Sequence, residues 1–218
     1  MTNQEFSIEF DILYNNISSN QAPGLTEYEK SVFLTKVQED IVTELYSGRS
    51  SIRNSFEETE EQRRYLNSLV YTETCAKYTG TEQKLTNKSD LYILPDDIMF
   101  ITYEHVVVEG KNDPLLVYPV SQDELYKILK NPFRGPNNSR VLRLDSCYNI
   151  VELISNYDIK DYIIRYVKKP NPIILCNLED GLSINGLSSE SECMLDSSLH
   201  RTILDRAVAL ALQTMYSK

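Results

Sequence analysis

The sequence lacks tryptophan and contains only two histidines and seven glycines among its 218 residues. A shortage of histidine limits acid–base and metal chemistry, and a shortage of glycine limits the loops that wrap phosphate groups. The motifs G-x-x-x-x-G-K-[ST], G-x-G-x-x-G, G-x-S-x-G and H-E-x-x-H are all absent from the sequence. The sequence therefore gives no positive sign of a nucleotide-binding enzyme, a serine hydrolase or a zinc protease, and we expect no cofactor.

Metal-binding spacings and long apolar runs are missing too. The four cysteines form no C-x-x-C pair, and none has a histidine at ligand spacing; they are Cys75, Cys147, Cys176 and Cys193. A zinc site is therefore not expected, and free thiols in a reducing cytoplasm are the default. No apolar run approaches the roughly 18 residues of a membrane span. Glu5, Glu9 and Asp11 stand where a signal peptide would have its basic and apolar regions.

Negative charge and tyrosine are abundant. Asp and Glu number 32 against 22 Lys and Arg, which gives a formal net charge of −10. Such a field repels phosphate, and this argues against nucleic-acid binding as the main task and against adhesion to an anionic membrane. The best candidate for a local basic patch is Arg165, Lys168 and Lys169, which we interpret as a solvated face. The 15 tyrosines suit strands and interfaces.

Both ends of the chain show the period of amphipathic helices. The N-terminal stretch predicts three helices. The first has its apolar stripe on Phe6, Phe10, Leu13 and Ile17. The second begins at the capping box Thr26-x-x-Glu29 and buries Val32, Phe33, Val37, Ile41 and Leu45, and the third begins at the capping box Ser55-x-x-Glu58 and has an apolar edge of Leu66, Leu69 and Val70. A fourth helix is predicted to start near Ser197 or Ser198 and to carry a wide apolar face from Leu199 to Met215. A face that wide must pack on something, and the N-terminal helices are the expected partners.

The middle of the chain is richer in β-branched and aromatic residues, and turn sequences such as Asn112-Asp113-Pro114 interrupt it. Strands are predicted at 72–78, 91–94, 99–108, 115–119, 140–144, 149–154, 162–167 and 173–175. A short helix at 121–129, capped by Ser121 with Glu124 at the third position, is expected among them. These elements predict a small antiparallel sandwich or barrel.

The predicted fold class is therefore α+β. It is a discontinuous helical bundle, made of three N-terminal helices plus the C-terminal helix, with an antiparallel β-rich domain inserted between the third and fourth helices. The expected boundaries are 1–70 plus 196–218 for the helical bundle and 71–195 for the β-rich domain.

One group of residues could carry chemistry. Asp96 and Asp97 precede the strand that contains His105, and carboxylates with an imidazole can hold a divalent cation. A metal-dependent hydrolase using Asp96, Asp97 and His105 is therefore one alternative function, and a generic cytoplasmic binding module is another. Adjacent aspartates after a proline are also ordinary turn chemistry. His105 in a strand and His200 at the start of the last helix are better explained as structural histidines, so we expect no catalytic or metal-binding residue.

Several segments resemble a known family in their pattern and order. They are 25–31 (LTEYEKS), 131–136 (NPFRGP), 165–175 (RYVKKPNPIIL), 193–195 (CML), Leu199-His200 and 203–211. This order resembles the neck proteins of crAss-like and related podovirus-type phages that infect Bacteroidetes and, more distantly, the tail-tube adaptor proteins of short-tailed phages. The resemblance covers most of the chain but contains no catalytic signature.

The resemblance implies a non-enzymatic virion subunit of the neck or tail, assembled in the host cytoplasm. Its implied partners are identical copies in a closed ring of twelvefold symmetry (a dodecameric homo-oligomer), the portal protein, and adjacent ring or tail proteins, with no membrane contact. A head-to-tail ring needs two different surfaces on each subunit. Net negative charge would let DNA pass with only weak contact. We therefore predict a structural head-to-tail connector (adaptor) subunit that joins the portal to the tail.

Overall fold

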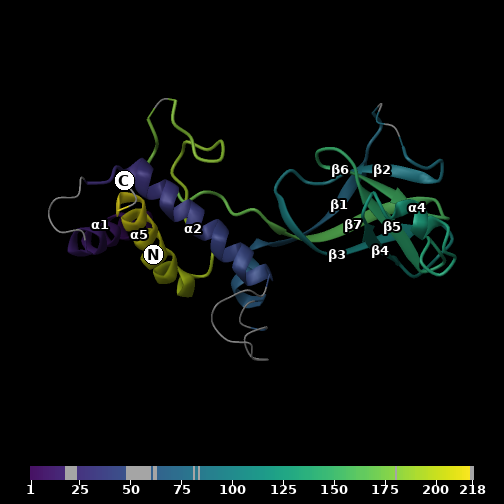
Figure 1. The fold of residues 1–218 in the computed structure, drawn as a ribbon, viewed down its shortest axis with the longest axis horizontal. Coiled ribbons are helices and arrows are strands. Elements are labelled where there is room, and N and C mark those ends of the chain that lie inside the picture. Colours follow the sequence, from purple (N-terminus) through teal and green to yellow (C-terminus); the bar gives the residue numbers. More distant parts are fainter. Residues whose placement is uncertain are drawn as a thin grey trace. The chain divides into compact units, whose positions relative to one another are not determined.

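The computed structural model describes residues 1–17, 24–47, 60, 63–80, 82, 84–179 and 181–216. They divide into two compact units (Figure 1). Met1–Leu69 with Lys169–Lys218 is called the helical unit, and Val70–Lys168 is called the barrel. Residues 169–195, which we assigned from the sequence to the β-rich domain, lie in the helical unit. None of the helices in the described ranges is long and apolar enough to cross a membrane.

Seven strands of the described chain close the barrel in the order β1-β2-β6-β5-β4-β3-β7. They are β1 (Val70–Lys77), β2 (Ser89–Ile93), β3 (Ile98–Val108), β4 (Leu115–Val120), β5 (Arg140–Asp145), β6 (Ile150–Ile154) and β7 (Ile159–Lys168). Each coincides with a strand predicted from the sequence, and those seven predictions are confirmed. The eighth predicted strand, 173–175, is extended in the helical unit and makes only an isolated bridge from Ile174 to Ser191.

Neighbouring strands of the barrel are antiparallel except β4 and β5, which run parallel. Parallel strands need a crossover connection of a dozen or more residues. Residues 121–139 provide it and contain the short helix α4 (Leu125–Leu129). Alternating side chains point inward and fill the barrel, where the rings of Tyr92 and Tyr162 meet edge to face at 5.4 Å.

The helical unit contains three long helices within the described residues: α1 (Asn3–Ile17), α2 (Glu27–Ser47) and α5 (His200–Tyr216). Single 3-10 turns lie at η1 (Asn67–Leu69) and η2 (Ser197–Leu199). The predicted capping box is confirmed at the start of α2, where the Thr26 amide donates to Glu29 Oε2 at 2.8 Å and the Glu29 amide donates to Thr26 Oγ1 at 3.3 Å. The α5 face packs on α1 and α2 through fully buried small and branched residues such as Ala207 and Ile203.

A buried lysine joins α1 to α2. Lys30 is only 2% exposed, and its ammonium donates to Asp11 at 2.7 Å, to Glu27 at 2.9 Å and to Ser7 Oγ at 3.2 Å. A buried ammonium is tolerated only when it is paired and its protons are bonded. Burial acts to lower the pKa of Lys30, but its hydrogen bonds to Asp11 and Glu27 raise it overall.

The inward face of α2 carries polar residues that bind extended backbone. Thr35 Oγ1 accepts from the Ile173 amide at 3.0 Å and donates to the Ile173 carbonyl at 3.3 Å. Ser31 Oγ accepts from the Leu175 amide at 3.1 Å, and Gln38 Nε2 donates to the Asn171 carbonyl at 2.8 Å. Ser31, Thr35 and Gln38 recur at helical spacing, so they lie on one side of α2. This side forms hydrogen bonds with backbone groups of the extended segment 171–175.

The predicted fold class, a helical bundle with an inserted antiparallel β-rich domain, is wrong. The β part closes a seven-stranded barrel and includes the parallel β4–β5 pair in the described residues. The face of α2 that a bundle would fill with another helix is instead bonded to the extended segment around Ile173. The predicted third helix from Ser55, with its capping box, lies largely outside the described residues, and β1 already begins at Val70.

Candidate functional site

The residues of the hydrolase hypothesis do not come together in the structure. Asp96 accepts a hydrogen bond from Asn149 at 2.7 Å, and Asp97 pairs with Lys168 at 3.1 Å. His105 lies eight residues farther along β3, which at about 3.3 Å per residue places it roughly 25 Å away. No group of three His, Cys, Asp or Glu side chains that could hold a metal ion occurs in the described part of the chain.

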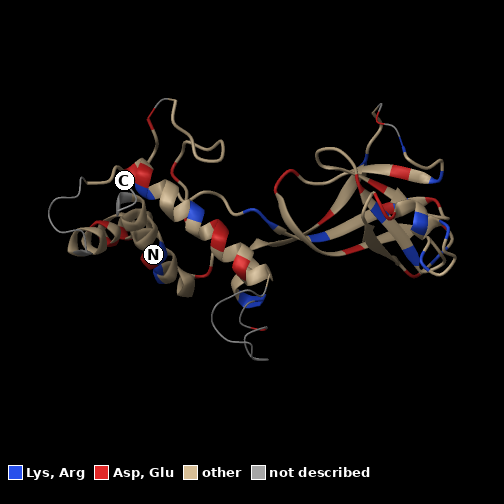
Figure 2. Cartoon of the chain, viewed as in Figure 1, with Lys and Arg blue, Asp and Glu red and all other residues tan. Residues whose placement is uncertain are grey.

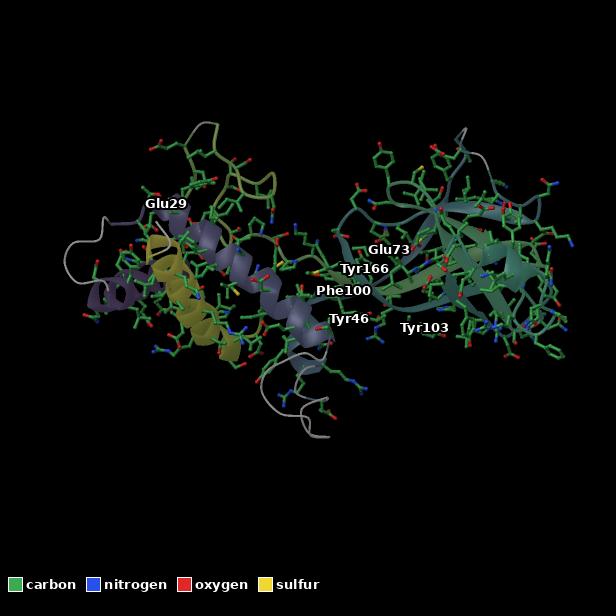
Figure 3. All side chains as sticks on the ribbon, viewed as in Figure 1. Glu29, Tyr46, Glu73, Phe100, Tyr103 and Tyr166 are labelled. Atoms are coloured by element: carbon green, nitrogen blue, oxygen red, sulfur yellow. The ribbon has the colours of Figure 1, made fainter. Side chains whose placement is uncertain are left out.

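Asp97 belongs instead to a polar group at one end of the barrel. The Tyr166 hydroxyl lies 3.1 Å from Asp97 Oδ1 and 3.3 Å from Glu73 Oε2, and Figure 3 shows Tyr166 beside Glu73. Burial and the hydrogen bond to Asp97 raise the pKa of Tyr166. This arrangement ties β1, β7 and the turn before β3 together.

The histidines and two of the cysteines occupy structural settings. The Nε2 atom of His200 lies 3.1 Å from the Leu195 carbonyl, and burial lowers the pKa of His200. The ring of His105 packs on Tyr103 with centroids 5.3 Å apart. Burial raises the pKa of the Cys75 thiol to about 12 and that of Cys193 to about 11, so neither is a ready nucleophile at neutral pH.

A buried charged cluster lies among the barrel strands. Arg143 of β5 donates to Glu104 of β3 at 2.6 Å, and the Tyr162 hydroxyl of β7 donates to the second Glu104 oxygen at 2.6 Å. Arg143 also reaches the exposed Asp145 at 3.1 Å. Burial and the Glu104 charge raise the pKa of Tyr162, so its hydroxyl stays a proton donor to Glu104. With both Glu104 oxygens bonded, the cluster ties three strands together.

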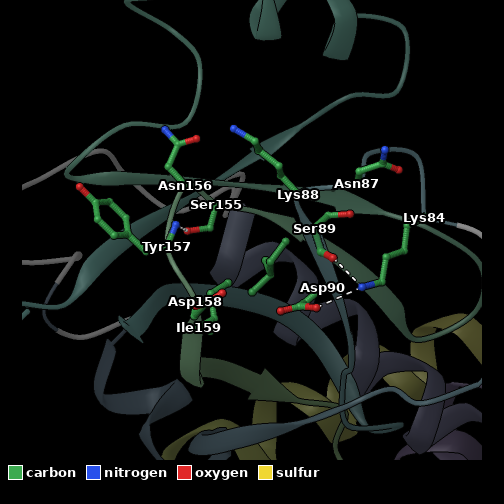
Figure 4. Close-up of a pocket in the computed structure, with 11 residues that line it drawn as sticks. Lys84, Asn87, Lys88, Ser89, Asp90, Ser155, Asn156, Tyr157, Asp158 and Ile159 are labelled. Carbon is green, nitrogen blue, oxygen red and sulfur yellow. Dashed lines mark hydrogen bonds and ion pairs between the residues drawn. The ribbon is translucent and has the colours of Figure 1, made fainter. Parts of the chain in front are cut away.

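A second buried carboxylate shapes the loop before β2. Glu152 accepts hydrogen bonds from the Leu85 and Thr86 amides at 3.0 and 3.1 Å, and from the Ser89 hydroxyl. The loop borders a polar hollow of about 340 Å³. Figure 4 shows Lys84 on its wall, bonded to Asp90 and to the Ser89 carbonyl. Lys84 therefore helps to fix the wall of the hollow.

The most distinctive surface of the barrel is the crossover between β4 and β5 together with the start of β5. From Leu125 to Leu144 the sequence has no Asp or Glu but five basic residues: Lys127, Lys130, Arg134, Arg140 and Arg143. Figure 2 shows basic positions on α4 and the surrounding loops. Lys127, Lys130 and Arg134 are exposed, and their side chains make no ion pair within the described residues.

Exposed aromatic rings accompany these charges. Phe133 is 86% exposed and Tyr126 is 62% exposed. Arg140 lies over the ring of Tyr118 at 4.7 Å, which holds this guanidinium against β4. Below the crossover, a second hollow of about 340 Å³ is lined by Leu129, Pro132, Gly135 and neighbouring residues. We call the surface formed by Tyr126, Lys127, Lys130, Phe133 and Arg134 the basic edge. Its exposed aromatic and cationic side chains are suited to contacting another macromolecule.

A family model described as "Phage tail ring protein 3/4" matches residues 1–218. The chain belongs to this family. Among its curated relatives, "Ring protein 3" of Bacteroides phage crAss001 is 49% identical over 220 residues, covering 97% of this chain and 95% of the relative. "Ring protein 4/5" of the same phage is 37% identical over 221 residues, covering 97% of this chain and 92% of the relative. The resemblance to ring and neck proteins of crAss-like phages is confirmed.

A phage tail ring protein is a structural component of the virion. Two of the three residues in the candidate basic patch, which we interpreted as a solvated face, are paired in the structure, and the third, Arg165, is exposed. Lys168 pairs with Asp97 in the barrel, and Lys169 pairs with Glu39 in the helical unit. The sequence held a signal for the basic edge, the run from Leu125 to Leu144 without an acidic residue. The net charge of −10 did not reveal this run, because it sums the charges of the whole chain and averages acidic and basic segments.

Proposed function

We propose that this phage tail ring protein is a non-enzymatic subunit of a closed homo-oligomeric ring, a dodecamer, that joins the portal to the tail. The observation that carries the proposal is the match of the ring-protein family model to residues 1–218. Copies assemble in the host cytoplasm and meet the portal protein and adjacent ring or tail proteins in the virion.

The charge distribution supports a channel that DNA passes through. With 32 acidic and 22 basic residues the chain as a whole repels phosphate, so a ring of many copies would give DNA few places to bind. The exposed cations of the basic edge are gathered on one crossover of the barrel. Segregated charge of this kind is typical of surfaces that bind a protein partner specifically and in one orientation.

Electron microscopy of the purified protein, alone and mixed with the portal protein of the same phage, tests the proposal. We expect closed rings of one size, with twelve copies in averaged top views, that stack coaxially on the portal. Mass photometry gives the number of copies independently. A chain that stays monomeric at every concentration, with and without portal, would refute the ring and connector roles together.

A further inference from the structure

Helix α1 presents a face that the described residues of its own unit leave exposed. Phe6, Phe10 and Tyr14 are fully buried on one side, whereas Ile8 is 51% and Ile12 is 54% exposed on the other. These two isoleucines are one helical turn apart, so they form a continuous apolar strip. An exposed apolar strip on a short amphipathic helix is the kind of feature that a partner surface covers.

The same face of α1 is acidic. Glu5, Glu9 and Asp11 flank the two isoleucines, and α1 contains no Lys or Arg. Glu9 bonds Arg201 at 3.0 Å and Asp11 bonds Lys30. Among the described residues, the Glu5 carboxylate accepts a hydrogen bond from the Thr2 amide at the helix start and makes no ion pair. We call Glu5, Ile8, Glu9, Asp11 and Ile12 the acidic stripe. Figure 2 shows the acidic positions on α1.

We propose that the basic edge of one copy docks on the acidic stripe of α1 in the next copy, so that the ring closes through a head-to-tail contact. This proposal rests on the proposed ring function. The basic edge carries two exposed aromatic rings beside three exposed cations. The acidic stripe carries two exposed isoleucines beside three carboxylates, of which Glu9 and Asp11 also pair with Arg201 and Lys30. Phe133 and Tyr126 would cover Ile8 and Ile12, while Lys127, Lys130 and Arg134 face the carboxylates.

The charges also select against other arrangements of two copies. A two-fold symmetric contact centred on either surface would bring like charges together, basic edge on basic edge or acidic stripe on acidic stripe. Like charges directly opposed across an interface weaken the contact. A head-to-tail contact avoids this repulsion and leaves one unused surface at each end of a growing arc, which is the condition for ring closure.

Two charge-reversed variants test the contact without disturbing its internal ion pairs. In the barrel-reversed variant, Lys127, Lys130 and Arg134 become Glu. In the helix-reversed variant, Glu5, Asn15 and Asn16 become Lys; all three are exposed, and Glu9 and Asp11 keep their partners. A matched control changes Lys160 to Glu and Tyr148 to Ser, which are exposed barrel residues outside the basic edge.

We expect each reversed variant alone to self-associate about tenfold or more weakly than wild type in sedimentation velocity and to form no rings. The control should assemble like wild type. An equimolar mixture of the two reversed variants should form rings again, because alternating copies then pair an acidic edge with a basic stripe and a basic edge with an acidic stripe. Circular dichroism of each variant verifies that it is folded.

The remaining outcomes separate the inference from the function on which it rests. If either reversed variant assembles like wild type, the docking surfaces are wrong although the ring stands. If both variants fail and their mixture also fails, the two surfaces do not bind each other. The basic edge would then serve another partner, and loss of binding to a 20-base-pair DNA in the barrel-reversed variant would identify nucleic acid. If wild type itself forms no ring, the proposed function falls.

Discussion

At the scale of single residues, Glu104 is a buried carboxylate that bonds two other side chains of the barrel. It is 7% exposed, and its two oxygens hold Arg143 and the Tyr162 hydroxyl. Replacing Glu104 with Gln would leave a buried guanidinium whose remaining partner is the exposed Asp145. We expect the free energy of unfolding to fall by about 3–5 kcal/mol, as for other buried ion pairs that lose one partner.

Urea unfolding followed by tyrosine fluorescence measures this change, since the chain has no tryptophan. The matched control is Asp145→Asn, which removes the other carboxylate from the same Arg143. Asp145 is 73% exposed, so its loss should cost less than about 1 kcal/mol. Equal decreases in the free energy of unfolding for the two variants would show that the buried ion pair with Glu104 stabilises the fold no more than the exposed one with Asp145.

His200 gives the helical unit a predictable response to acid. Burial lowers the pKa of His200 below its ordinary value of 6.5. Between the folded and the ordinary pKa, the unfolded chain therefore binds more protons, and the free energy of unfolding falls as pH falls. We expect the melting temperature of the wild type to decrease between pH 7 and pH 5 more steeply than that of His200→Gln, measured by circular dichroism. Parallel curves would contradict this assignment.

At the scale of elements, the strands were predictable and the pairing of β4 with β5 was not. Alternating side chains and turn sequences mark each strand locally. The parallel direction of β5 depends on the crossover at 121–139, which we predicted only as a short helix between strands. In the structure α4 is confined to Leu125–Leu129, and Ser121 and Glu124 lie in the preceding turn, linked backbone to backbone at 3.2 Å.

Helix α2 shows why the apolar period misplaced a buried face. The predicted stripe included Val32, which is 37% exposed, and omitted Thr35 and Gln38, which are buried. A hydrophobic pattern assigns polar residues to the surface, but Thr35 is buried here because its hydroxyl binds the backbone of Ile173. The pattern therefore located the helix but not the partner on its inward side. The basic edge was missed for a related reason, because only the fold turns that run of charge into one surface.

The contact between α2 and the extended segment predicts an element-scale effect. In Thr35→Val the shape is kept, but the Ile173 amide and carbonyl lose the hydroxyl that binds both. Leaving buried backbone groups unsatisfied should lower the free energy of unfolding by about 1–3 kcal/mol. Thr43→Val is the control, because the exposed Thr43 bonds the Glu39 carbonyl of its own helix and no other group among the described residues. Denaturant unfolding of both variants decides whether the two threonines differ as expected.

At the scale of the whole molecule, the barrel begins and ends on neighbouring strands. Val70 of β1 pairs with Val167 of β7, so cutting the chain at Val70 and Lys168 leaves all seven strands intact. A fragment of residues 70–168 should therefore fold by itself and show a cooperative thermal transition in circular dichroism. A fragment without such a transition would mean that the barrel depends on the rest of the chain.

The folded fragment would carry the basic edge without the acidic stripe, because α1 is absent from it. In a head-to-tail ring it could occupy the stripe of one full-length copy but would offer no stripe to the next, so it should terminate growing arcs. We expect substoichiometric fragment to reduce the number of closed rings counted by electron microscopy. The same fragment with Lys127, Lys130 and Arg134 changed to Glu should have no effect. Equal inhibition by both fragments would show that the barrel blocks assembly through some surface other than the basic edge.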